Sequence, residues 1–146
     1  MLDTARLLGS HEVVPMKIGV LKETAPGERR VALVPEMLAR LRGAGLDVLV
    51  QSGAGEGAWF ADSAYAEAGA AIVSRDELVT GADLVLSIGR PDEPVAGALR
   101  SGQAVLGMLN PLVDPAFVAG LAGRGVTVSA WTGCLARCRR RRRWTR

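Results

Sequence analysis

The stretch MKIGVLKETAPGERRVALVPEMLARLRGAGLDVLV, residues 16–50, decides the fold class of this chain. It begins with a short apolar strand pattern at Lys17–Leu21. A pattern of apolar residues at helical spacing covers Pro35–Ala44, and a second strand pattern covers Leu46–Val50. A strand, a helix and a strand in this order are typical of a right-handed crossover between parallel strands.

The same alternation continues to residue 130. Further helices are expected at Asp62–Ala68, Ser74–Thr80, Glu93–Arg100 and Asp114–Gly123, and further strands at Ala70–Val73, Leu84–Ile88, Ala104–Met108 and Val126–Ala130. Asp62, Ser74 and Asp114 are the expected N-caps, and the nearly all-apolar run Leu84–Ile88 indicates a strand buried on both faces. The sequence therefore predicts an α/β fold, a doubly wound, mostly parallel sheet of Rossmann type with helices on both faces.

Three segments differ in composition. Residues 1–15 show no clear period and are expected to be a loose extension, with a short helix as the alternative and Met16 as a candidate start. Residues 16–130 form the predicted domain. Residues 131–146 are strongly basic, since seven arginines lie at or after Arg137, and they are expected to be disordered. The rest of the chain, residues 1–136, is mildly acidic, because eleven Lys and Arg face fifteen Asp and Glu.

Several function classes find little support in this composition. Cys134 and Cys138 lack a second pair and lie far from the single histidine, His11, so no metal site is expected. The longest apolar stretch is interrupted by prolines and by polar residues, so no membrane span is expected. An acidic body without a base-reading module argues against a nucleic-acid partner. Without a convincing signal peptide, a cytoplasmic location is the default expectation.

Basic residues follow two of the expected strands at their carboxyl ends, where ligands bind in open α/β sheets. The loop that begins at Lys22 also carries Arg30, whose planar guanidinium is suited to a carboxylate or phosphate. Arg90 follows the strand Leu84–Ile88. We take Lys22, Arg30 and Arg90 as candidate ligand-facing residues. The alternative for the first loop is a solvated turn with an internal ion pair.

Two other features carry less chemistry. The run Gly53-Ala54-Gly55-Glu56-Gly57 follows a strand, but its spacing departs from that of a dinucleotide loop, and a flexible turn is the favoured interpretation. Nothing in the chain resembles a nucleophile paired with a base, so no catalytic residue is assigned.

The combination of K-E-x-x-x-x-E-x-R-V-A-L-x-P, V-x-x-G-A-G-E-G-A and F-x-D-x-A-Y-x-x-A-G-A resembles the start of the alanine dehydrogenase/transhydrogenase family. The resemblance covers residues 16 to about 130. It implies a doubly wound N-terminal domain, which agrees with the periodicity. It also implies that Arg30 occupies the position that contacts the substrate carboxylate in alanine dehydrogenases.

Two positions separate the branches of this family. By the resemblance of this chain to the family, alanine dehydrogenases carry an active-site lysine at the position of Gly89. They carry a histidine at the position of Asn110. Glycine has no side chain to polarise a keto acid, and asparagine is not an acid–base group. The resemblance therefore favours the α subunit of proton-translocating NAD(P) transhydrogenases, which passes hydride between nicotinamides and lacks both residues.

The family continues beyond the last expected strand with a nicotinamide loop and a second, glycine-rich NAD domain. Here the chain continues instead with a segment that contains cysteines and arginines. A shifted frame across residues 131–145 can be read as P-R…A-Q-T-M-D-A, which resembles that loop. We predict that residues 131–146 are an out-of-frame translation without an evolved role, which the coding DNA can test.

The resemblance thus implies a truncated enzyme subunit. The full family enzyme uses NAD(H) and NADP(H), dimerises and joins membrane and NADP-binding partner subunits at the cytoplasmic membrane face. This chain alone is expected to be inactive and to bind no cofactor tightly. The alternatives are a fragment of an alanine dehydrogenase-like oxidoreductase, and a non-catalytic interaction domain with a basic tail.

Overall fold

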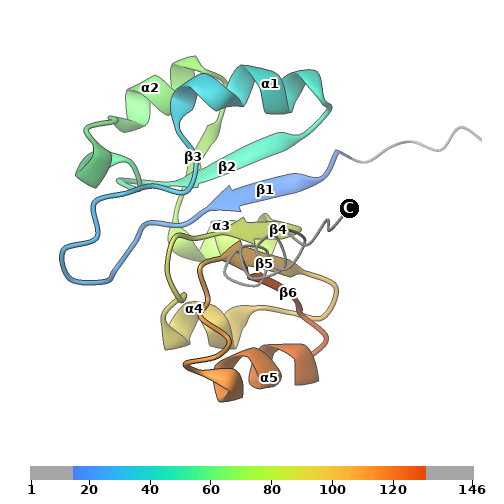
Figure 1. Ribbon diagram of the computed structural model, residues 1–146. Coiled ribbons are helices and arrows are strands. Elements are labelled where there is room, and N and C mark those ends of the chain that lie inside the picture. Colours follow the sequence, from blue (N-terminus) through green and yellow to red (C-terminus); the bar gives the residue numbers. More distant parts are fainter. Residues whose placement is uncertain (1–14, 131–146) are drawn as a thin grey trace, which may run out of the picture.

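The computed structural model describes residues 15–130 (Figure 1). Nearly all of the predicted N-terminal extension lies outside these residues, together with its alternative as a short helix. The basic tail 131–146 and all three Cys and His residues also lie outside them. The predictions for these segments therefore remain predictions.

Six parallel strands form one sheet in the order β3-β2-β1-β4-β5-β6. The strands are β1 (Lys17–Val20), β2 (Asp47–Gln51), β3 (Ala71–Val73), β4 (Leu84–Leu86), β5 (Ala104–Gly107) and β6 (Thr127–Ala130). Every pairing is parallel, with Ile18 opposite both Val48 and Leu84 in the centre. The predicted α/β fold and its parallel sheet are confirmed.

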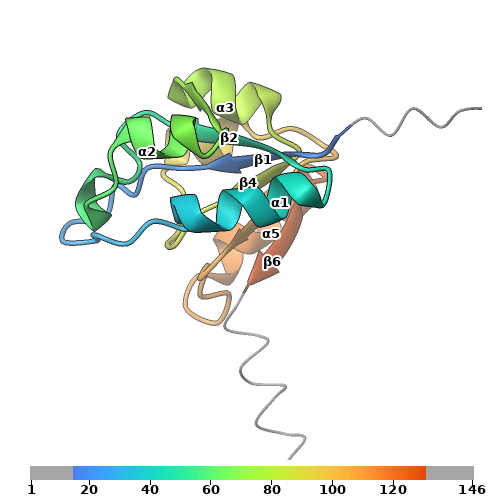
Figure 2. The same cartoon turned by 90° about the horizontal axis from the view of Figure 1, so that it is seen from above.

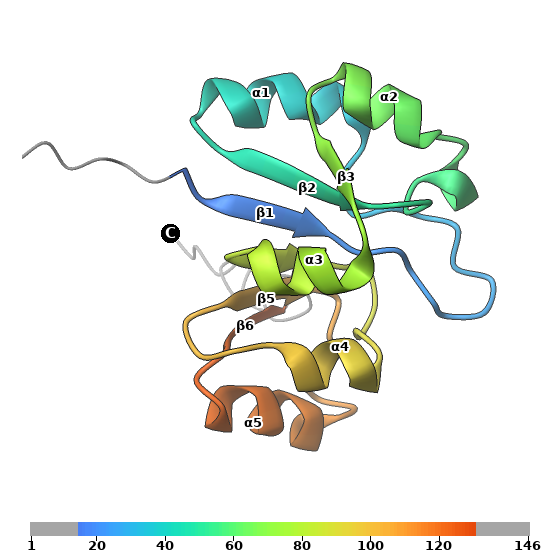
Figure 3. The ribbon, with the colours of Figure 1, turned by 180° about the vertical axis from the view of Figure 1, so that it is seen from behind.

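Helices cover both faces of the sheet (Figures 2 and 3). They are α1 (Leu38–Gly43), α2 (Asp62–Glu67), α3 (Arg75–Gly81), α4 (Glu93–Ala98) and α5 (Pro115–Gly123), with short 3₁₀ turns η2 (Pro35–Met37) and η3 (Glu56–Ala58). Helices α1 and α2 pack over β2 and β3 on one face, whereas α3, α4 and α5 pack on the other. Each connection is therefore a crossover from one strand to the next parallel strand.

The strand order places a switch point at the centre of the sheet. The chain runs outward from β1 to β3 in one direction, then returns to β4 and runs outward in the other. Loops that leave β1 and β4 consequently diverge at the carboxyl edge. Open α/β sheets bind ligands in the crevice at such a point.

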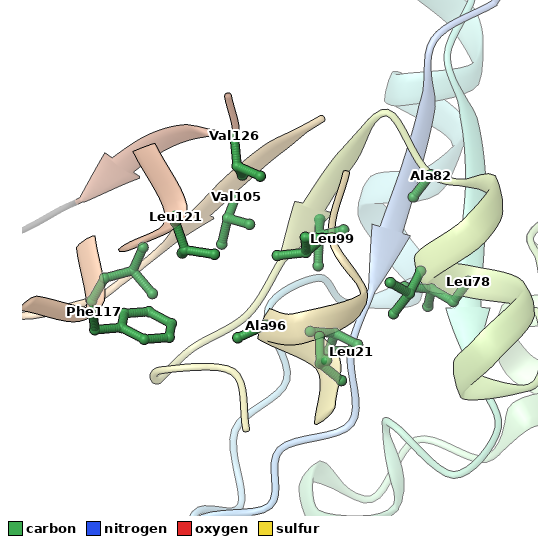
Figure 4. Packing of buried hydrophobic residues seen from close by; sticks show 13 residues of the cluster. Leu21, Leu78, Ala82, Ala96, Leu99, Val105, Phe117, Leu121 and Val126 are labelled. Carbon is green, nitrogen blue, oxygen red and sulfur yellow. The ribbon is translucent and has the colours of Figure 1, made fainter. Parts of the chain in front are cut away.

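Two apolar clusters form the core, one on each face of the sheet. The larger cluster joins α3, α4 and α5 to the sheet through residues such as Leu78, Val85, Leu99, Val105 and Leu121 (Figure 4). The smaller cluster contains Leu38 of α1 and Tyr65 of α2 and packs on β1 and β2. Aliphatic residues dominate both clusters, as the low aromatic content predicts.

Most expected helix starts are confirmed. Ser74 caps α3 in a reciprocal capping box with Glu77, and Asp114 caps α5 by accepting from the backbone N–H of Phe117. The predicted N-cap at Asp62 is wrong, because Ala61 is the N-cap and Asp62 is the first helical residue. The carboxylate of Asp62 instead accepts hydrogen bonds from the preceding loop. This loop offers it more donors than a single helical N–H group would.

Some boundaries also differ from the expected ones. The helix expected over Pro35–Ala44 begins as a 3₁₀ turn and becomes α-helical only at Leu38. Strand β4 ends at Leu86, two residues before the end of the apolar run. Val85 points to one face and is fully buried, whereas Leu84 and Leu86 point to the other face and are half-buried, so the expected burial holds on one face only.

Gly19 allows α3 to approach the central strand. A Cβ atom at this position would lie 2.7 Å from Leu78 Cδ2 and 2.8 Å from Ala82 Cβ. We expect Gly19→Ala to lower the free energy of unfolding by about 1–3 kcal/mol, since overpacking a close-packed core costs that much. Urea unfolding followed by circular dichroism measures the change.

Gly120, within α5, provides the matched control. A Cβ there would meet no described atom within 4 Å, so Gly120→Ala is expected to raise the unfolding free energy by about 0.5–1 kcal/mol. Equal stability of the two variants would show that α3 does not need the close approach.

Candidate functional site at the carboxyl edge

Glu23 joins the two strands that diverge at the switch point. Its carboxylate accepts hydrogen bonds from the backbone N–H of Ile88 at 2.6 Å and of Gly89 at 3.1 Å. The hydroxyl of Ser87 donates to the carbonyl of Gly89 at 2.8 Å in the same turn. The exit of β4 is therefore held in place by a side chain that leaves β1.

Lys22, the first predicted site residue, lies beside this turn on the other side of β1. Its ammonium forms an ion pair with Glu56 at 3.0 Å, and its backbone N–H donates to the side-chain oxygen of Gln51. Both partners belong to β2 and the loop that follows it. Lys22 is about half exposed, so this ion pair is a weak restraint that a competing anion can replace.

Arg30 is engaged by an acidic neighbour. Its guanidinium donates to both carboxylate oxygens of Glu28, at 2.8 and 2.7 Å. These hydrogen bonds lower the pKa of Glu28 from 4.5 to about 2 and raise the pKa of Arg30. The arrangement is the internal ion pair that the sequence left open as the alternative. Arg30 nevertheless stays exposed at the carboxyl edge, where an incoming anion can reach it.

Arg90 follows β4 but turns toward α4 and α5. It forms ion pairs with Asp114 at 2.6 Å and with Glu93, and its guanidinium lies 4.2 Å from the ring centre of Phe117. The structure thus brings Lys22 and Arg30 to one hollow. Lys22 and Arg90 both line a second, very small hollow of about 10 Å³ at the switch point, and Arg90 also lines a hollow between α4 and α5. With two carboxylates and an aromatic face as partners, Arg90 joins the two helices.

The glycine-rich loop after β2 is a packed turn rather than a flexible one. The amides of Ala54, Glu56 and Ala58 donate within the loop, and that of Gly53 donates to the carboxylate of Asp62. A Cβ at Gly55 would lie 2.6 Å from the carbonyl oxygen of Phe60. The amides of Gly53, Ala54 and Glu56 are therefore not available to a dinucleotide phosphate, which needs free amides.

Gly89 and Asn110 are the two positions that the sequence predicts to distinguish the branches. Gly89 follows β4, and a Cβ there would have Glu23 Oε2 as its nearest neighbour, at 3.6 Å, an ordinary van der Waals distance. Asn110 follows β5 with a left-handed φ of 42°, and its carbonyl accepts from Val113 and Asp114. Asparagine tolerates this conformation better than most residues. The backbone therefore accounts for Asn110 but not for Gly89.

The hollow beside Lys22 and Arg30 is small. A hollow of about 120 Å³ lies among Lys22, Glu28, Arg30 and the glycine-rich loop. Sites for drug-sized ligands and cofactors usually enclose about 300–1,000 Å³. The hollow can admit a carboxylate or a phosphate group, but it cannot enclose a dinucleotide. This domain therefore presents one wall of a site rather than a complete one.

The described residues, 15–130, offer neither a cluster of metal ligands nor a helix that could span a membrane. No cluster of three or more His, Cys, Asp and Glu side chains has the arrangement of a metal site. None of the helices in this part of the chain has the length and apolarity needed to cross a membrane.

Sequence reasoning missed three residues that shape the site. From the sequence, Glu23 is expected at most to pair with a nearby arginine, and Asp62 is expected to cap a helix. No role is predicted for Gln51. All three act on backbone N–H groups of other segments. Only the strand order reveals that Glu23 lies beside the end of β4.

Comparison with known proteins gives a family to this architecture. The family model described as "Alanine dehydrogenase/PNT, N-terminal domain" matches residues 19–143. The chain belongs to this family. The first part of the alpha subunit of NAD(P) transhydrogenase from Rhodospirillum rubrum is 36% identical over 121 residues, which are 79% of this chain. Alanine dehydrogenase from Mycobacterium tuberculosis is also 36% identical, over 80% of the chain.

Solved structures agree with both branches of the alanine dehydrogenase/PNT family. The transhydrogenase from Sinorhizobium meliloti superposes with a TM-score of 0.74 at 33% identity and covers 78% of this chain. An L-alanine dehydrogenase superposes equally well, at 31% identity over 79% of the chain. The chain spans about a third of the length of the curated relatives, 32% in each case.

Glu23→Gln tests the restraint at the switch point of this alanine dehydrogenase/PNT domain. An amide offers one acceptor oxygen and places an N–H₂ group against a backbone donor. We expect a loss of about 1.5–3 kcal/mol of unfolding free energy, the range for hydrogen bonds to charged groups. Glu67→Gln, on the exposed side of α2, is the matched control and should change stability little. Equal losses would contradict the assigned role.

The pair of Glu28 and Arg30 makes a prediction about pH. Because the pKa of Glu28 is depressed to about 2 in the folded state, the ion pair is fully present above pH 4.5 and is lost as the pH falls through about 2. Carbon-13 NMR of the Glu28 carboxyl should follow this titration. Arg30→Ala should return the pKa toward 4.5. A wild-type Glu28 that titrates near 4.5 would show that the pair does not persist in solution.

Proposed function

We propose that this chain is the N-terminal part of the NAD(H)-binding alpha subunit of a proton-translocating NAD(P) transhydrogenase. The full protein would transfer hydride between NADH and NADP⁺, coupled to proton passage through partner subunits. One observation carries the choice of branch, the glycine at position 89.

Gly89 is informative because nothing local requires a glycine there. Its φ is not in the left-handed region, and the nearest described neighbour of an added Cβ is the Glu23 carboxylate at 3.6 Å. A Cβ atom would be accommodated there, beside an anionic neighbour. The absence of a lysine from such a position favours a reaction that needs no ammonium group beside a keto acid. Hydride transfer between two nicotinamides is such a reaction.

The residues of this domain would act as one wall of the nicotinamide site. NAD(H) and NADP(H) would supply the hydride chemistry, while the protein supplies position and exclusion of water. Lys22 and Arg30 would present positive charge at the edge that faces the cofactor. The glycine-rich loop, in which the amides of Gly53, Ala54 and Glu56 already have acceptors, would support this wall rather than hold a phosphate.

The assembly follows from the same proposal. The alpha subunit would dimerise and would contact the NADP-binding and membrane subunits at the cytoplasmic membrane face. Residues 16–130 alone lack a dinucleotide loop of the usual spacing, and the hollow beside Lys22 and Arg30 is small. The 146-residue chain would consequently neither bind NAD tightly nor transfer hydride.

Alanine dehydrogenase is the second candidate, and Arg30 favours it. The identity to an alanine dehydrogenase equals that to the transhydrogenase subunit, at 36%. Arg30 occupies the position of the carboxylate-binding arginine, and it is exposed at the edge. An alanine dehydrogenase would need other groups to replace the missing lysine and histidine. The third candidate, an interaction domain with a basic tail, rests on residues outside the described part of the chain.

Grafting separates the two enzyme branches. Residues 16–130 would replace the corresponding third of the Rhodospirillum rubrum subunit and, separately, of the Mycobacterium tuberculosis alanine dehydrogenase. The first chimera, mixed with its partner subunits, should transfer hydride from NADH to an NADP⁺ analogue. The second should show no reductive amination of pyruvate, because acid–base groups contribute about 10²–10⁴-fold to such rates.

Restored side chains provide the control. Gly89→Lys combined with Asn110→His should recover activity in the alanine dehydrogenase chimera and should not improve the transhydrogenase chimera. Alanine dehydrogenase activity of the unmodified graft would overturn the proposed branch. Calorimetric titration of the 146-residue chain with NADH should show no tight binding, and an affinity like that of a complete NAD site would contradict its role as a wall.

A further inference from the structure

A bulky side chain occupies a backbone conformation that glycine normally takes. Trp59 ends η3 with a φ of 65°, in the left-handed region. Large residues rarely adopt this region, and glycine is the usual residue where a helical turn ends in it. Trp59 is nevertheless 85% exposed, so packing in the core does not explain why a tryptophan stands there. A backbone outlier of this kind points to a function of the side chain.

The backbone around Trp59 is held by its neighbours. The N–H of Phe60 donates to the carbonyl of Gly55 across the turn, at 3.0 Å. Gly57 packs against the loop that follows β1, because a Cβ at Gly57 would lie 3.1 Å from the Cα and from the carbonyl oxygen of Arg29. The loops that follow β1 and β2 therefore meet at one corner of the molecule, where they hold the backbone of Trp59 in place (Figures 1 and 3).

Arg29 gives this corner a positive charge that no carboxylate within residues 15–130 neutralises in an ion pair. Its guanidinium carbon lies 5.8 Å from the centre of the Trp59 ring, within the range of a cation–π contact. The other two basic residues of the same loop, Lys22 and Arg30, each have a glutamate partner. An exposed aromatic ring and a cation without a carboxylate partner thus lie side by side.

A hollow of the size of an anionic group adjoins the contact between Trp59 and Arg29. Arg29 lines the hollow of about 120 Å³ that Lys22 and Arg30 also line. Because Arg29 belongs both to the hollow and to the aromatic contact, the two are joined through a single residue. A ligand that uses both must carry an anionic group and, beyond a short spacer, a planar ring.

We propose that a mononucleotide binds to the stacking corner, the surface formed by Trp59, Arg29, Lys22 and Arg30. The base stacks on the exposed Trp59 ring, and the phosphate enters the hollow. Bases of every kind stack on aromatic side chains, and the planar fork of an arginine suits a phosphate. The ribose supplies the spacer between these two groups. A simple aromatic carboxylate fits less well, since its charge adjoins its ring.

The stacking corner goes beyond the proposed function and does not depend on which enzyme branch is correct. Binding is weak, because Lys22 and Arg30 must exchange their glutamate partners for the phosphate at an exposed surface. We expect a dissociation constant on the order of 1 mM from one stacked base and one exposed charge contact. Such an affinity is far below that of a complete NAD site, so the expected absence of tight NAD binding is unchanged.

The fluorescence of Trp59 tests for the stacked base. Trp131→Phe and Trp144→Phe leave Trp59 as the single tryptophan of the 146-residue chain. Adenosine monophosphate should quench its emission in a saturable way, whereas adenosine, which lacks the phosphate, should bind about tenfold more weakly. Inorganic phosphate should compete with the nucleotide without quenching by itself. Equal quenching by adenosine and by the nucleotide, or quenching that does not saturate, would overturn the proposal.

Trp59→Gly separates binding from stability. Glycine adopts the left-handed region without strain, so the variant should fold at least as stably as the parent chain. Its affinity for adenosine monophosphate should fall by about tenfold or more, the effect of losing one stacked base. The amide NMR signal of Gly57 follows binding in both proteins. If circular dichroism shows that this variant does not fold, Trp59→Asn replaces it, since asparagine also tolerates a positive φ. Unchanged affinity would overturn the proposal.

Arg29→Gln tests the cation, with Arg40→Gln on the exposed side of α1 as the matched control. The first variant should weaken nucleotide binding severalfold, and the second should not change it. Equal affinities of the two variants would contradict the role of Arg29. Both readouts are local to Trp59 and Gly57, so phosphate bound by the arginines at and beyond Arg137 does not contribute. No hydride transfer is measured, so failure of the proposed function would leave this outcome unaffected.

Discussion

The carboxylate of Glu23 determines how the centre of this molecule is arranged. Strands β1 and β4 are neighbours, yet the chain leaves them in opposite directions, so no turn connects their ends. By accepting from the amides of Ile88 and Gly89, Glu23 supplies that connection. The loop that carries Lys22 and Arg30 and the turn that carries Gly89 are thereby fixed relative to each other by the protein itself, before any ligand is present.

Local patterns were enough to predict the elements of the fold. The apolar periods located every strand, and Ser74 and Asp114 cap helices because their acceptors are three residues away in sequence. The site depends on contacts that no local pattern contains. Glu23 and Ile88 are separated by 65 residues, and Asp62 turned from its own helix to the amide of Gly53 because a buried loop N–H must find an acceptor. The ion pair of Arg30 with Glu28 joins residues only two positions apart, and the sequence predicts it as an alternative.

The alanine dehydrogenase/PNT family shows how one scaffold serves two reactions. A transhydrogenase and an alanine dehydrogenase both superpose on this domain with a TM-score of 0.74, so the backbone does not distinguish the two branches. In this chain the neighbouring strands β4 and β5 are followed by Gly89 and Asn110, the two positions predicted to differ between the branches. A sheet edge that is rigid by its own hydrogen bonds tolerates the exchange of such side chains, which is the usual relation between fold and function.

The order of strands also bears on how the chain assembles as it is synthesised. Among residues 15–130 the first strand to be synthesised is a central one, and each later strand joins the outer edge of the sheet, first on one side and then on the other. No strand has to be inserted between two partners. Nascent chains of this topology can therefore fold outward in the order of translation, at the pace of synthesis. Within residues 15–130 the last strand, β6, adds only to β5.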